Sequence, residues 1–372
     1  MIPERRFPTY EAEERLRAMR SADAEPVPLH GTSSPALPAH VVDAVAAALR
    51  GPMRPPPARG LEPLRKLLAG ELRRTTGRSV DPESEILVTN GAMQALGVCF
   101  QALLEPGDEV VVPAPCFFFE GPIRAAGGVP AYIRGSAADG WRWDADEIER
   151  ALGARTRALL LCNPGNPTGY VPDRDDVAAV VRAAAAHDIV VVTDEAYEAS
   201  LWEGATFTSA FGLADDAIVI RSLGKSLSMP HLRIGVLAGP ADRVAACARV
   251  LEWDCLRVGL AAQEAARAAL AGPRDWLAEI HAHMDAARAV ALAAVGASPG
   301  LVTVAPRAAP FLFLGAATGG AVADDLISVG LPVVDGRHFQ APGHARLPFG
   351  GAAEARAALE QALARFARLR TP

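Results

Sequence analysis

Seven short apolar runs alternate with amphipathic helical patterns through the first three quarters of the chain. Each run is rich in valine, isoleucine and leucine, and polar residues do not alternate regularly within it. Continuous runs of this kind are typical of strands that are buried on both faces of a mostly parallel sheet. They lie within residues 85–90, 108–115, 129–133, 157–163, 188–195, 217–222 and 234–239. The pattern therefore predicts a large, doubly wound α/β domain over residues 46–285.

The pattern changes on either side of this region. Residues 1–45 combine a short helical pattern with a stretch rich in proline, glycine and serine, which indicates an N-terminal arm that joins a smaller domain. A long alanine-rich helix is expected over residues 273–295. Four short apolar segments and an amphipathic terminal helix follow it. We therefore predict a smaller α+β domain over residues 286–372.

Composition narrows the possible partners. Half of the residues are apolar and 22% are charged, and the net charge is −6 with arginines interspersed among carboxylates, which argues against a nucleic-acid surface. Charged residues interrupt the longest apolar stretch, residues 177–192, so no membrane span is predicted. Five widely spaced cysteines without a CxxC pair favour neither a disulfide framework nor a metal site. A reducing, cytoplasmic environment is the simplest expectation, and the charged N-terminus has no secretory pattern.

Polar and conformationally special residues follow five of the predicted strands. In an open parallel sheet, ligands gather at the carboxyl ends of the strands. These positions should therefore lie along one edge, where they can form one site. The five segments are residues 90–92, 115–117, 163–169, 194–195 and 222–225.

Lysine is almost absent from the chain. Arginine supplies 35 of the 37 basic residues, and the two lysines are Lys66 and Lys225. Lysine can lose its proton and form an imine with an aldehyde, which arginine cannot do. Lys66 lies in an ordinary amphipathic helix pattern, whereas Lys225 follows a strand end. The alternatives for Lys225 are an ordinary charged loop residue and a phosphate-loop lysine, but the latter requires glycine where the chain has Val219.

The other strand ends suit an aldehyde cofactor that carries a phosphate, and pyridoxal phosphate fits every part. A carboxylate such as Asp194 can keep the pyridine nitrogen protonated, and Asn166 and Tyr197 can hold the phenolate oxygen. A phosphate favours a helix N-terminus, a hydroxyl group and an arginine. The helix that opens within residues 90–96, Ser222 and Arg233 supply these groups.

With these residues in place, the chain resembles the class I/II aminotransferases, which are fold-type-I enzymes dependent on pyridoxal phosphate. The segments "NPGNPTG" (163–169), "DEAYE" (194–198) and "SLGKSLSMPHLRIG" (222–235) occur in the order and spacing of that family. The resemblance extends to residues 29–38, 60–65, 89–96, 111–119 and 345–350, and so covers nearly the whole chain.

The resemblance implies a role for each matching position. Lys225, Asp194 and Tyr197 would be catalytic, with Lys225 forming the imine and shuttling the proton. The residues that would hold the cofactor are Gly91, Ala92, Met93, Phe117, Asn166, Asp194, Tyr197, Ser222, Lys225 and Arg233. The substrate carboxylate would be bound by Gly31, Asn166 and Arg346. Phe117 would stack on the cofactor ring, while its neighbours Phe118 and Phe119 are expected in the core.

Two positions depart from the family pattern. Pro55 stands where members often carry a tyrosine that reaches the phosphate of the neighbouring subunit, and the nearby cations are Arg54 and Arg59. Gly224 stands where many members carry a hydroxyl group. Neither position takes part in the imine chemistry, but both suggest an altered pocket between subunits.

The resemblance implies ping-pong transfer of an amino group between an α-amino acid and a 2-oxo acid, in a homodimer with shared active sites. The same scaffold hosts other chemistry. A carbon–sulfur β-lyase and a decarboxylating or oxidative deaminating enzyme therefore stay open as alternatives. A cofactor-binding regulator is a further alternative, although the first 45 residues are short and acidic for a DNA-binding domain.

Overall fold

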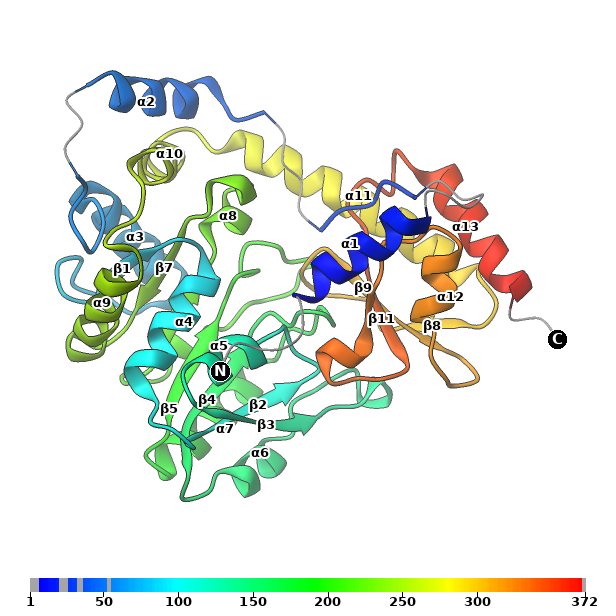
Figure 1. The fold of residues 1–372 in the computed structure, drawn as a ribbon, viewed down its shortest axis with the longest axis horizontal. Helices are drawn as coiled ribbons and strands as arrows, with labels where there is room; N and C mark the ends of the chain where they lie inside the picture. Colours follow the sequence, from blue (N-terminus) through cyan, green and yellow to red (C-terminus); the bar gives the residue numbers. More distant parts are fainter. Residues whose placement is uncertain (1–6, 20–25, 32–35, 52–54, 370–372) are drawn as a thin grey trace.

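The computed structural model describes residues 7–19, 26–31, 36–51 and 55–369 of the chain. Two sheets organise these residues, one of seven strands and one of four (Figure 1). The larger sheet contains β1 (Ile86–Thr89), β2 (Glu109–Ala114), β3 (Val129–Arg134), β4 (Thr156–Cys162), β5 (Val190–Asp194), β6 (Ile218–Arg221) and β7 (Gly235–Ala238). The smaller sheet contains β8 (Leu301–Thr303), β9 (Phe311–Ala316), β10 (Val334–Asp335) and β11 (His344–Pro348).

The larger sheet has the strand order β1-β7-β6-β5-β4-β2-β3, with β7 antiparallel to both of its neighbours. The other strands share one direction, so their carboxyl ends meet along one edge. All seven apolar runs form the strands that the sequence predicts, and the doubly wound, mostly parallel fold class is confirmed. The smaller sheet, with the order β10-β11-β9-β8, is antiparallel throughout.

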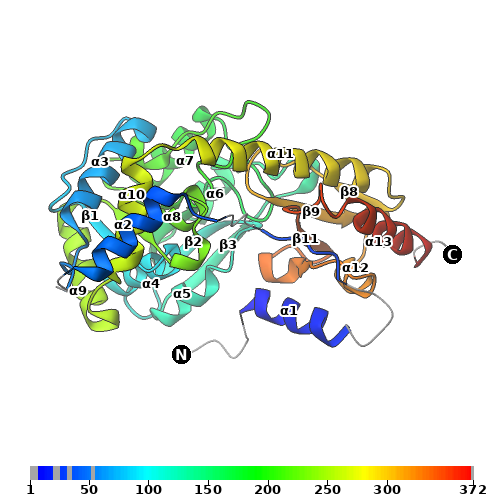
Figure 2. The same cartoon turned by 90° about the horizontal axis from the view of Figure 1, so that it is seen from above.

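Helices cover both faces of the larger sheet (Figure 2). One face carries α4 (Ala92–Leu103), α5 (Glu120–Ala125) and α9 (Ala241–Cys255), over a core that includes Leu96 and Phe100. The other carries α3 (Glu62–Thr76), α6 (Ala145–Ala151), α7 (Arg174–Ala186) and α10 (Leu260–Ala271), over a core that includes Leu64 and Phe211. Leucine, valine and alanine in periodic positions of these helices bury one side of each against the sheet.

The remaining helices are α1 (Pro8–Met19), α2 (Ala39–Arg50), α8 (Leu223–Ser226), α11 (Asp275–Gly296), α12 (Ala323–Ser328) and α13 (Arg356–Leu369). Of these, α2 and α8 pack against the core of the larger body, whereas the others frame the smaller sheet or connect the two bodies. Short 3₁₀ helices span Ala137–Asp139, Ala210–Gly212, Pro230–Leu232 and Gly336–Phe339. Helices α11, α12 and α13 share an apolar core with the smaller sheet, as expected for the C-terminal α+β region.

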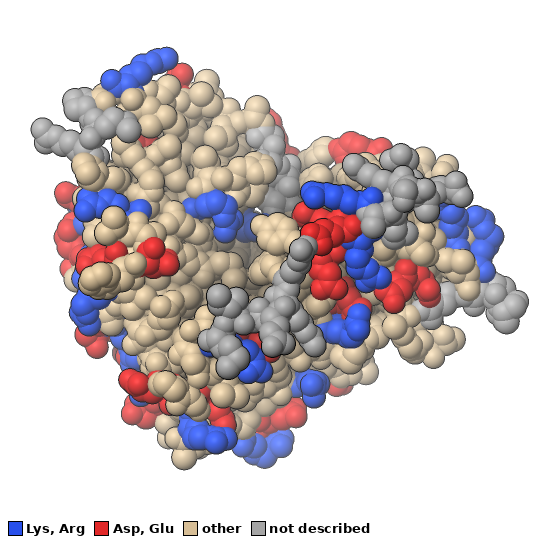
Figure 3. All heavy atoms as spheres, viewed as in Figure 1, with Lys and Arg blue, Asp and Glu red and all other residues tan. Residues whose placement is uncertain are grey.

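Helix α11 passes from the larger body to the smaller one, and α1 lies across the boundary between them (Figures 1 and 2). The predicted boundaries at residues 45/46 and 285/286 fall inside α2 and α11, and these exact domain limits stay a prediction. On the face drawn in Figure 3, acidic and basic side chains are interspersed, in keeping with the mixed charge of the sequence. Among the described residues, no helix is both long and apolar enough to cross a membrane.

Candidate active site

A cavity of about 930 Å³ opens at the carboxyl edge of the larger sheet, between that sheet and the smaller one. Strand ends, helix starts and the smaller sheet all contribute to its lining. With the exception of Gly91, which immediately precedes the lining residue Ala92, every site residue predicted from the sequence lines this cavity. They are Gly31, Ala92, Met93, Phe117, Asn166, Asp194, Tyr197, Ser222, Lys225, Arg233 and Arg346.

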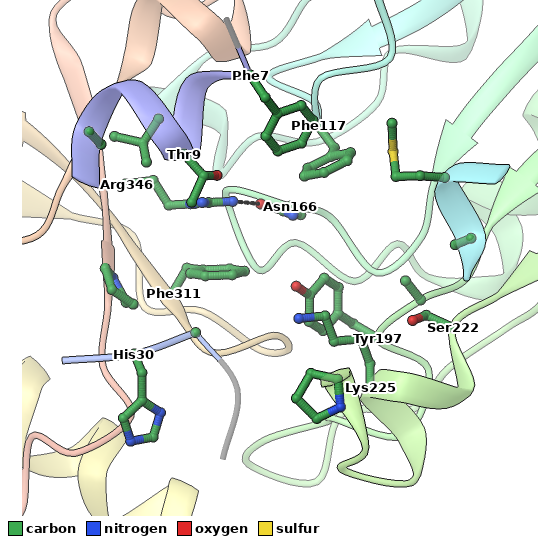
Figure 4. Close-up of a pocket in the computed structure, with 18 of the residues that line it drawn as sticks. Phe7, Thr9, His30, Phe117, Asn166, Tyr197, Ser222, Lys225, Phe311 and Arg346 are labelled. Atoms are coloured by element: carbon green, nitrogen blue, oxygen red, sulfur yellow. Dashed lines mark hydrogen bonds between the residues drawn. The ribbon is translucent and has the colours of Figure 1, made fainter. Parts of the chain in front are cut away.

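Lys225 lies in the short helix α8, which begins directly after strand β6. Its ammonium nitrogen is 5.9 Å from the centre of the Tyr197 ring (Figure 4). Burial, together with the charges of Arg346 and Arg233, lowers the pKa of Lys225 to about 8. The lowered pKa makes the neutral amine, which imine formation and proton transfer both require, far more accessible than in an ordinary lysine.

Asp194 is the last residue of β5 and is nearly enclosed. Its Oδ1 accepts a hydrogen bond of 3.0 Å from the backbone N–H of Ala196. Burial raises the pKa of Asp194 to about 7, against the lowering effect of that hydrogen bond. A carboxyl group in this setting favours a cationic partner, because a neighbouring positive charge would restore its ionised form.

Arg346 reaches the cavity from β11 of the smaller sheet. It is buried, and its Nη1 donates a hydrogen bond of 3.0 Å to Oδ1 of Asn166, which lies on the loop after β4 (Figure 4). Its guanidinium carbon is 4.2 Å from the ring centre of Phe311 and 5.0 Å from that of Phe339. Burial lowers the pKa of Arg346 to about 10, yet the group stays protonated near neutral pH. A buried cation with free donor capacity suits a carboxylate ligand.

A compact anion cradle lies at the start of α4. Gly91 has a φ of +80°, which is accessible mainly to glycine, and a Cβ at this position would come within 2.7 Å of Nη2 of Arg233. The backbone turn and the guanidinium therefore approach each other closely, which a side chain at residue 91 would prevent. The α4 N-terminus and Arg233 together supply N–H donors and positive charge for a phosphate.

Gly31 and the aromatic neighbours of the site complete the arrangement. A Cβ on Gly31 would approach the ring of Phe311 to 2.9 Å, so the absent side chain lets the N-terminal arm pass beside that ring. Phe117 lines the cavity, whereas Phe118 and Phe119 are buried, as the sequence predicts. Phe118 also has its ring centre 5.7 Å from the Arg346 guanidinium carbon, which the sequence does not indicate.

Of the residues near the position of the missing tyrosine, Pro55 and Arg59 are described by the structure, and neither lines the cavity of its own chain. Pro55 is exposed. Arg59 donates a hydrogen bond of 2.8 Å to the carbonyl oxygen of Ser84 instead, and Arg54 lies outside the described residues.

Sequence reasoning missed the contribution of α1. Phe7 and several residues of α1 line the cavity, among them Thr9, Ala12 and Glu13. The helix is fixed to the smaller body by an ion pair of 2.5 Å between Arg15 and Asp324. The charged pattern of α1 is that of a solvated helix, and the local pattern of the sequence contains no signal that places Phe7 at the site.

Comparison with known proteins identifies the family of this chain. A model of the family described as aminotransferase class I and II matches residues 27–366. This chain belongs to that family. An aspartate/prephenate aminotransferase from Thermus thermophilus is 34% identical over 341 residues, which cover 89% of this chain and 87% of the relative. An aspartate aminotransferase from Geobacillus stearothermophilus is 30% identical over 347 residues, again covering 89% and 87%.

Solved structures agree with the sequence relatives. The Thermus thermophilus aspartate aminotransferase with maleate has a TM-score of 0.91 and 32% identity, over 98% of this chain and 97% of the other. The Rhizobium meliloti aspartate aminotransferase has a TM-score of 0.90 and 26% identity, over 98% and 96%. The aminotransferase activity and the fold that the sequence predicts are thereby confirmed.

Membership of the aminotransferase family implies pyridoxal phosphate as the cofactor. The residues of this chain fit such a group on three counts. The cradle of Gly91 and Arg233 suits its phosphate, the enclosed Asp194 carboxyl suits its protonated ring nitrogen, and Lys225 has the lowered pKa that an aldehyde partner requires. All three groups border the same cavity or its rim.

Proposed function

We propose that this aminotransferase moves an amino group from an α-amino acid to a 2-oxo acid in two half-reactions, with pyridoxal phosphate as carrier. The observation that carries the proposal is the convergence of Lys225, Asp194 and Arg346 on one cavity. When bound, the cofactor supplies an aldehyde for the substrate amine and a ring that accepts electrons from the substrate Cα. The chain supplies binding, orientation and proton transfer.

In this proposal the cofactor is held at several points. The backbone N–H groups of residues 91–93, with Ser222 and Arg233, bind its phosphate. Asp194 keeps the ring nitrogen protonated, and Asn166 and Tyr197 donate hydrogen bonds to the phenolate oxygen. Phe117 covers one face of the ring. Burial raises the pKa of Tyr197 above its usual range, so the hydroxyl keeps its proton and can act as donor.

The substrate is oriented by its carboxylate. Arg346 binds this group in a forked pair that Asn166 supports, and the backbone of Gly31 lies beside it. This places the substrate Cα toward Lys225, whose neutral amine removes the Cα proton and later returns a proton to the carrier. General acid–base catalysis of this type contributes about 10²–10⁴-fold. Phe311 and Phe339 against Arg346 exclude water, which strengthens the carboxylate contact.

We further expect a homodimer in the cytoplasm. At the end of α9, Trp253 is 94% exposed and Leu256 is 68% exposed in the single chain. Large apolar side chains with this exposure are typical of surfaces that a second copy covers.

A stoichiometric half-reaction tests the proposal. The loaded enzyme is mixed with one L-amino acid at a time without any 2-oxo acid, and both the 2-oxo acid and ammonia are measured. We expect one equivalent of 2-oxo acid per site, no ammonia, and recovery of the enzyme when a second 2-oxo acid is added. Continuous release of pyruvate and ammonia would show elimination, and continuous release of carbon dioxide would show decarboxylation. Either result would refute amino transfer.

A further inference from the structure

The wall of the cavity on the α1 side is aromatic. The ring centres of Phe7 and Phe117 are 6.1 Å apart in an edge-on arrangement, and both rings contact Phe118 at 5.1 and 4.7 Å. Phe339 continues the cluster at 4.9 Å from Phe118. Figure 4 shows Phe7 and Phe117 on one side of Asn166, with Lys225 on the other. An aromatic wall therefore lies beyond the carboxylate-binding pair as seen from the lysine.

This wall lies where the side chain of a bound α-amino acid is expected. The carboxylate of an α-amino acid is assigned to Arg346 and Asn166, and its amino group lies toward Lys225. The side chain must then leave Cα in another direction. The space that α1 closes, with Phe7, Thr9 and Ala12 in its lining, is available in the same cavity.

The cavity cation that contacts the aromatic wall is Arg346, whose guanidinium carbon is 5.7 Å from the Phe118 ring centre and 5.0 Å from that of Phe339, and this group is already assigned to the substrate α-carboxylate. Of the cationic side chains that line the cavity in the described part of the chain, Lys225 and Arg346 already have roles, and Arg233 lies against Gly91. His231 also lines the cavity, and it lies two residues before Arg233 in the chain. The side chain of His30 points away from Phe7 and Phe117 in Figure 4.

The charged side chain that α1 itself adds to the lining is an acid. Glu13 lines the cavity at the mouth and is 3.8 Å from Arg17 in a largely exposed ion pair. An exposed pair of this kind contributes little, and it leaves a carboxylate facing the entrance. A second carboxylate on the substrate would meet phenylalanine rings and Glu13, and it would lose its hydration without a described cation in exchange.

We propose that the substrate side chain is aromatic, so that this enzyme transfers the amino group of a phenylalanine-like amino acid in preference to that of a dicarboxylic one. The inference rests on the proposed function, since it assigns the substrate class of the same site. An aromatic ring would bury its apolar surface against Phe7 and Phe117 and extend their edge-on packing. The acid group that distinguishes aspartate would find no comparable partner there.

Binding of unreactive analogues tests this without turnover. The loaded enzyme is titrated by calorimetry with 3-phenylpropionate and with succinate, which are the amine-free counterparts of phenylalanine and aspartate. Each ligand offers the same carboxylate to Arg346, so a difference in affinity reports on the rest of the ligand. We expect 3-phenylpropionate to bind at least about tenfold more tightly, because its ring is buried against the aromatic wall. Equal or tighter binding of succinate would overturn the inference.

Variants of Phe7 locate the effect at the aromatic wall. Phe7→Ala should weaken 3-phenylpropionate about tenfold or more, and Phe7→Leu should weaken it less. Phe7→Lys should move the preference toward succinate. The matched control is acetate, whose carboxylate lacks a side chain and whose affinity should stay the same in all three variants. Unchanged affinity of 3-phenylpropionate in both Phe7→Ala and Phe7→Lys would refute a role for the wall.

Amino transfer itself separates the two proposals. With phenylalanine, aspartate and lysine as donors, phenylalanine should give the highest kcat/KM. A higher value for aspartate or lysine would overturn the aromatic assignment while the amino-transfer function stands. Formation of no 2-oxo acid from any amino acid would remove the proposed function, and the inference with it.

Discussion

Two adjacent carboxyl groups at the end of β5 have opposite surroundings. Asp194 borders the cavity, and its carboxyl group accepts a hydrogen bond from the backbone N–H of Ala196. Glu195 faces the core, where its Oε2 accepts bonds of 3.1 and 2.8 Å from Nε and Nη2 of Arg221. Its Oε1 accepts from the hydroxyl of Ser209. Successive side chains of an extended chain point to opposite sides, so one step along β5 separates the two settings.

The comparison extends to the cations. In the cavity, Lys225 and Arg346 lie near each other, and the charge of Arg346 lowers the pKa of the lysine. In the core, Arg221 lies between Glu195 and the hydroxyl of Thr75, to which its Nη1 donates a bond of 2.7 Å. The cavity group is arranged to meet incoming anions, whereas the core group is satisfied by the chain itself. The charged groups of the cavity are therefore available to bind ligands, whereas those of the core stabilise the fold.

Replacing Lys225 should separate activity from stability most strongly. Lys225→Ala should lower the rate of amino transfer by at least about 10³-fold, because the imine-forming amine and the proton carrier are both lost. The midpoint of thermal unfolding should stay the same or rise, since a buried cation beside two arginines is removed. Steady-state kinetics and calorimetry measure the two quantities. The matched control is Lys66→Ala, which changes the other lysine of the chain, on the exposed face of α3.

Lys66→Ala should leave the rate unchanged. Turnover of Lys225→Ala near the wild-type level would show that the cavity lysine is not the catalytic amine.

In contrast to Lys225→Ala, Arg221→Met should lower the free energy of unfolding. Both partners of the pair are buried, with 5% exposure for the Arg221 side chain and 0% for Glu195. Removing one partner of a buried pair leaves an uncompensated charge and costs about 3–5 kcal/mol. Urea unfolding measures the loss. Arg124→Met breaks the exposed pair of Arg124 with Glu120 and should cost less than about 1 kcal/mol.

The double variant Arg221→Met with Glu195→Gln should recover part of the loss, because no carboxylate then remains uncompensated. If Arg221→Met cost no more than Arg124→Met, the buried pair of Arg221 with Glu195 would not stabilise the fold more than an exposed pair does.

The sequence predicts the cavity residues much better than it predicts the buried pair of Arg221 with Glu195. Strand ends carry the cavity residues, and a parallel sheet aligns strand ends, so Asp194 and Lys225 can be placed together from the positions of apolar runs. The Arg221–Glu195 pair joins residues 26 positions apart, and it depends on β5 and β6 being neighbours in the sheet. Apolar runs predict that both strands exist, but they do not predict their order.

The same limit applies to α1. Its periodic charges predict a helix with a solvated face, and the structure contains that helix at Pro8–Met19. Its place over the cavity depends on contacts with distant residues, such as the pair of Arg15 with Asp324 and that of Glu11 with His338 at 3.7 Å. Local pattern contains no information about contacts across some three hundred residues, so Phe7 could not be assigned to the site from the sequence.

The smallest predicted effect concerns Glu198, a buried carboxyl group that interacts with the charges of Arg221 and Glu195. Its Oε2 is enclosed and has no hydrogen-bond partner in the described structure. Burial raises the pKa of Glu198 to about 7, Arg221 opposes this rise, and the negative charge of Glu195 adds to it. Because the folded-state pKa lies above the unfolded value, the native state binds the proton more tightly. The contribution to stability is therefore complete below about pH 4.5 and is lost as the pH rises through 7.

Glu198→Gln should remove this dependence. Between pH 5 and 7, one proton bound only by the native state makes the free energy of unfolding fall by at most about 1.4 kcal/mol per pH unit, and the variant should lack that part of the slope. Urea unfolding at several pH values measures it, and Glu360→Gln, in an exposed pair on α13, should keep the wild-type slope. A Glu198→Gln slope equal to the wild-type slope would show that Arg221 neutralises both carboxyl groups. The core would then be as fully compensated as the Glu195 contacts alone suggest, and the contrast with the cavity would be sharper still.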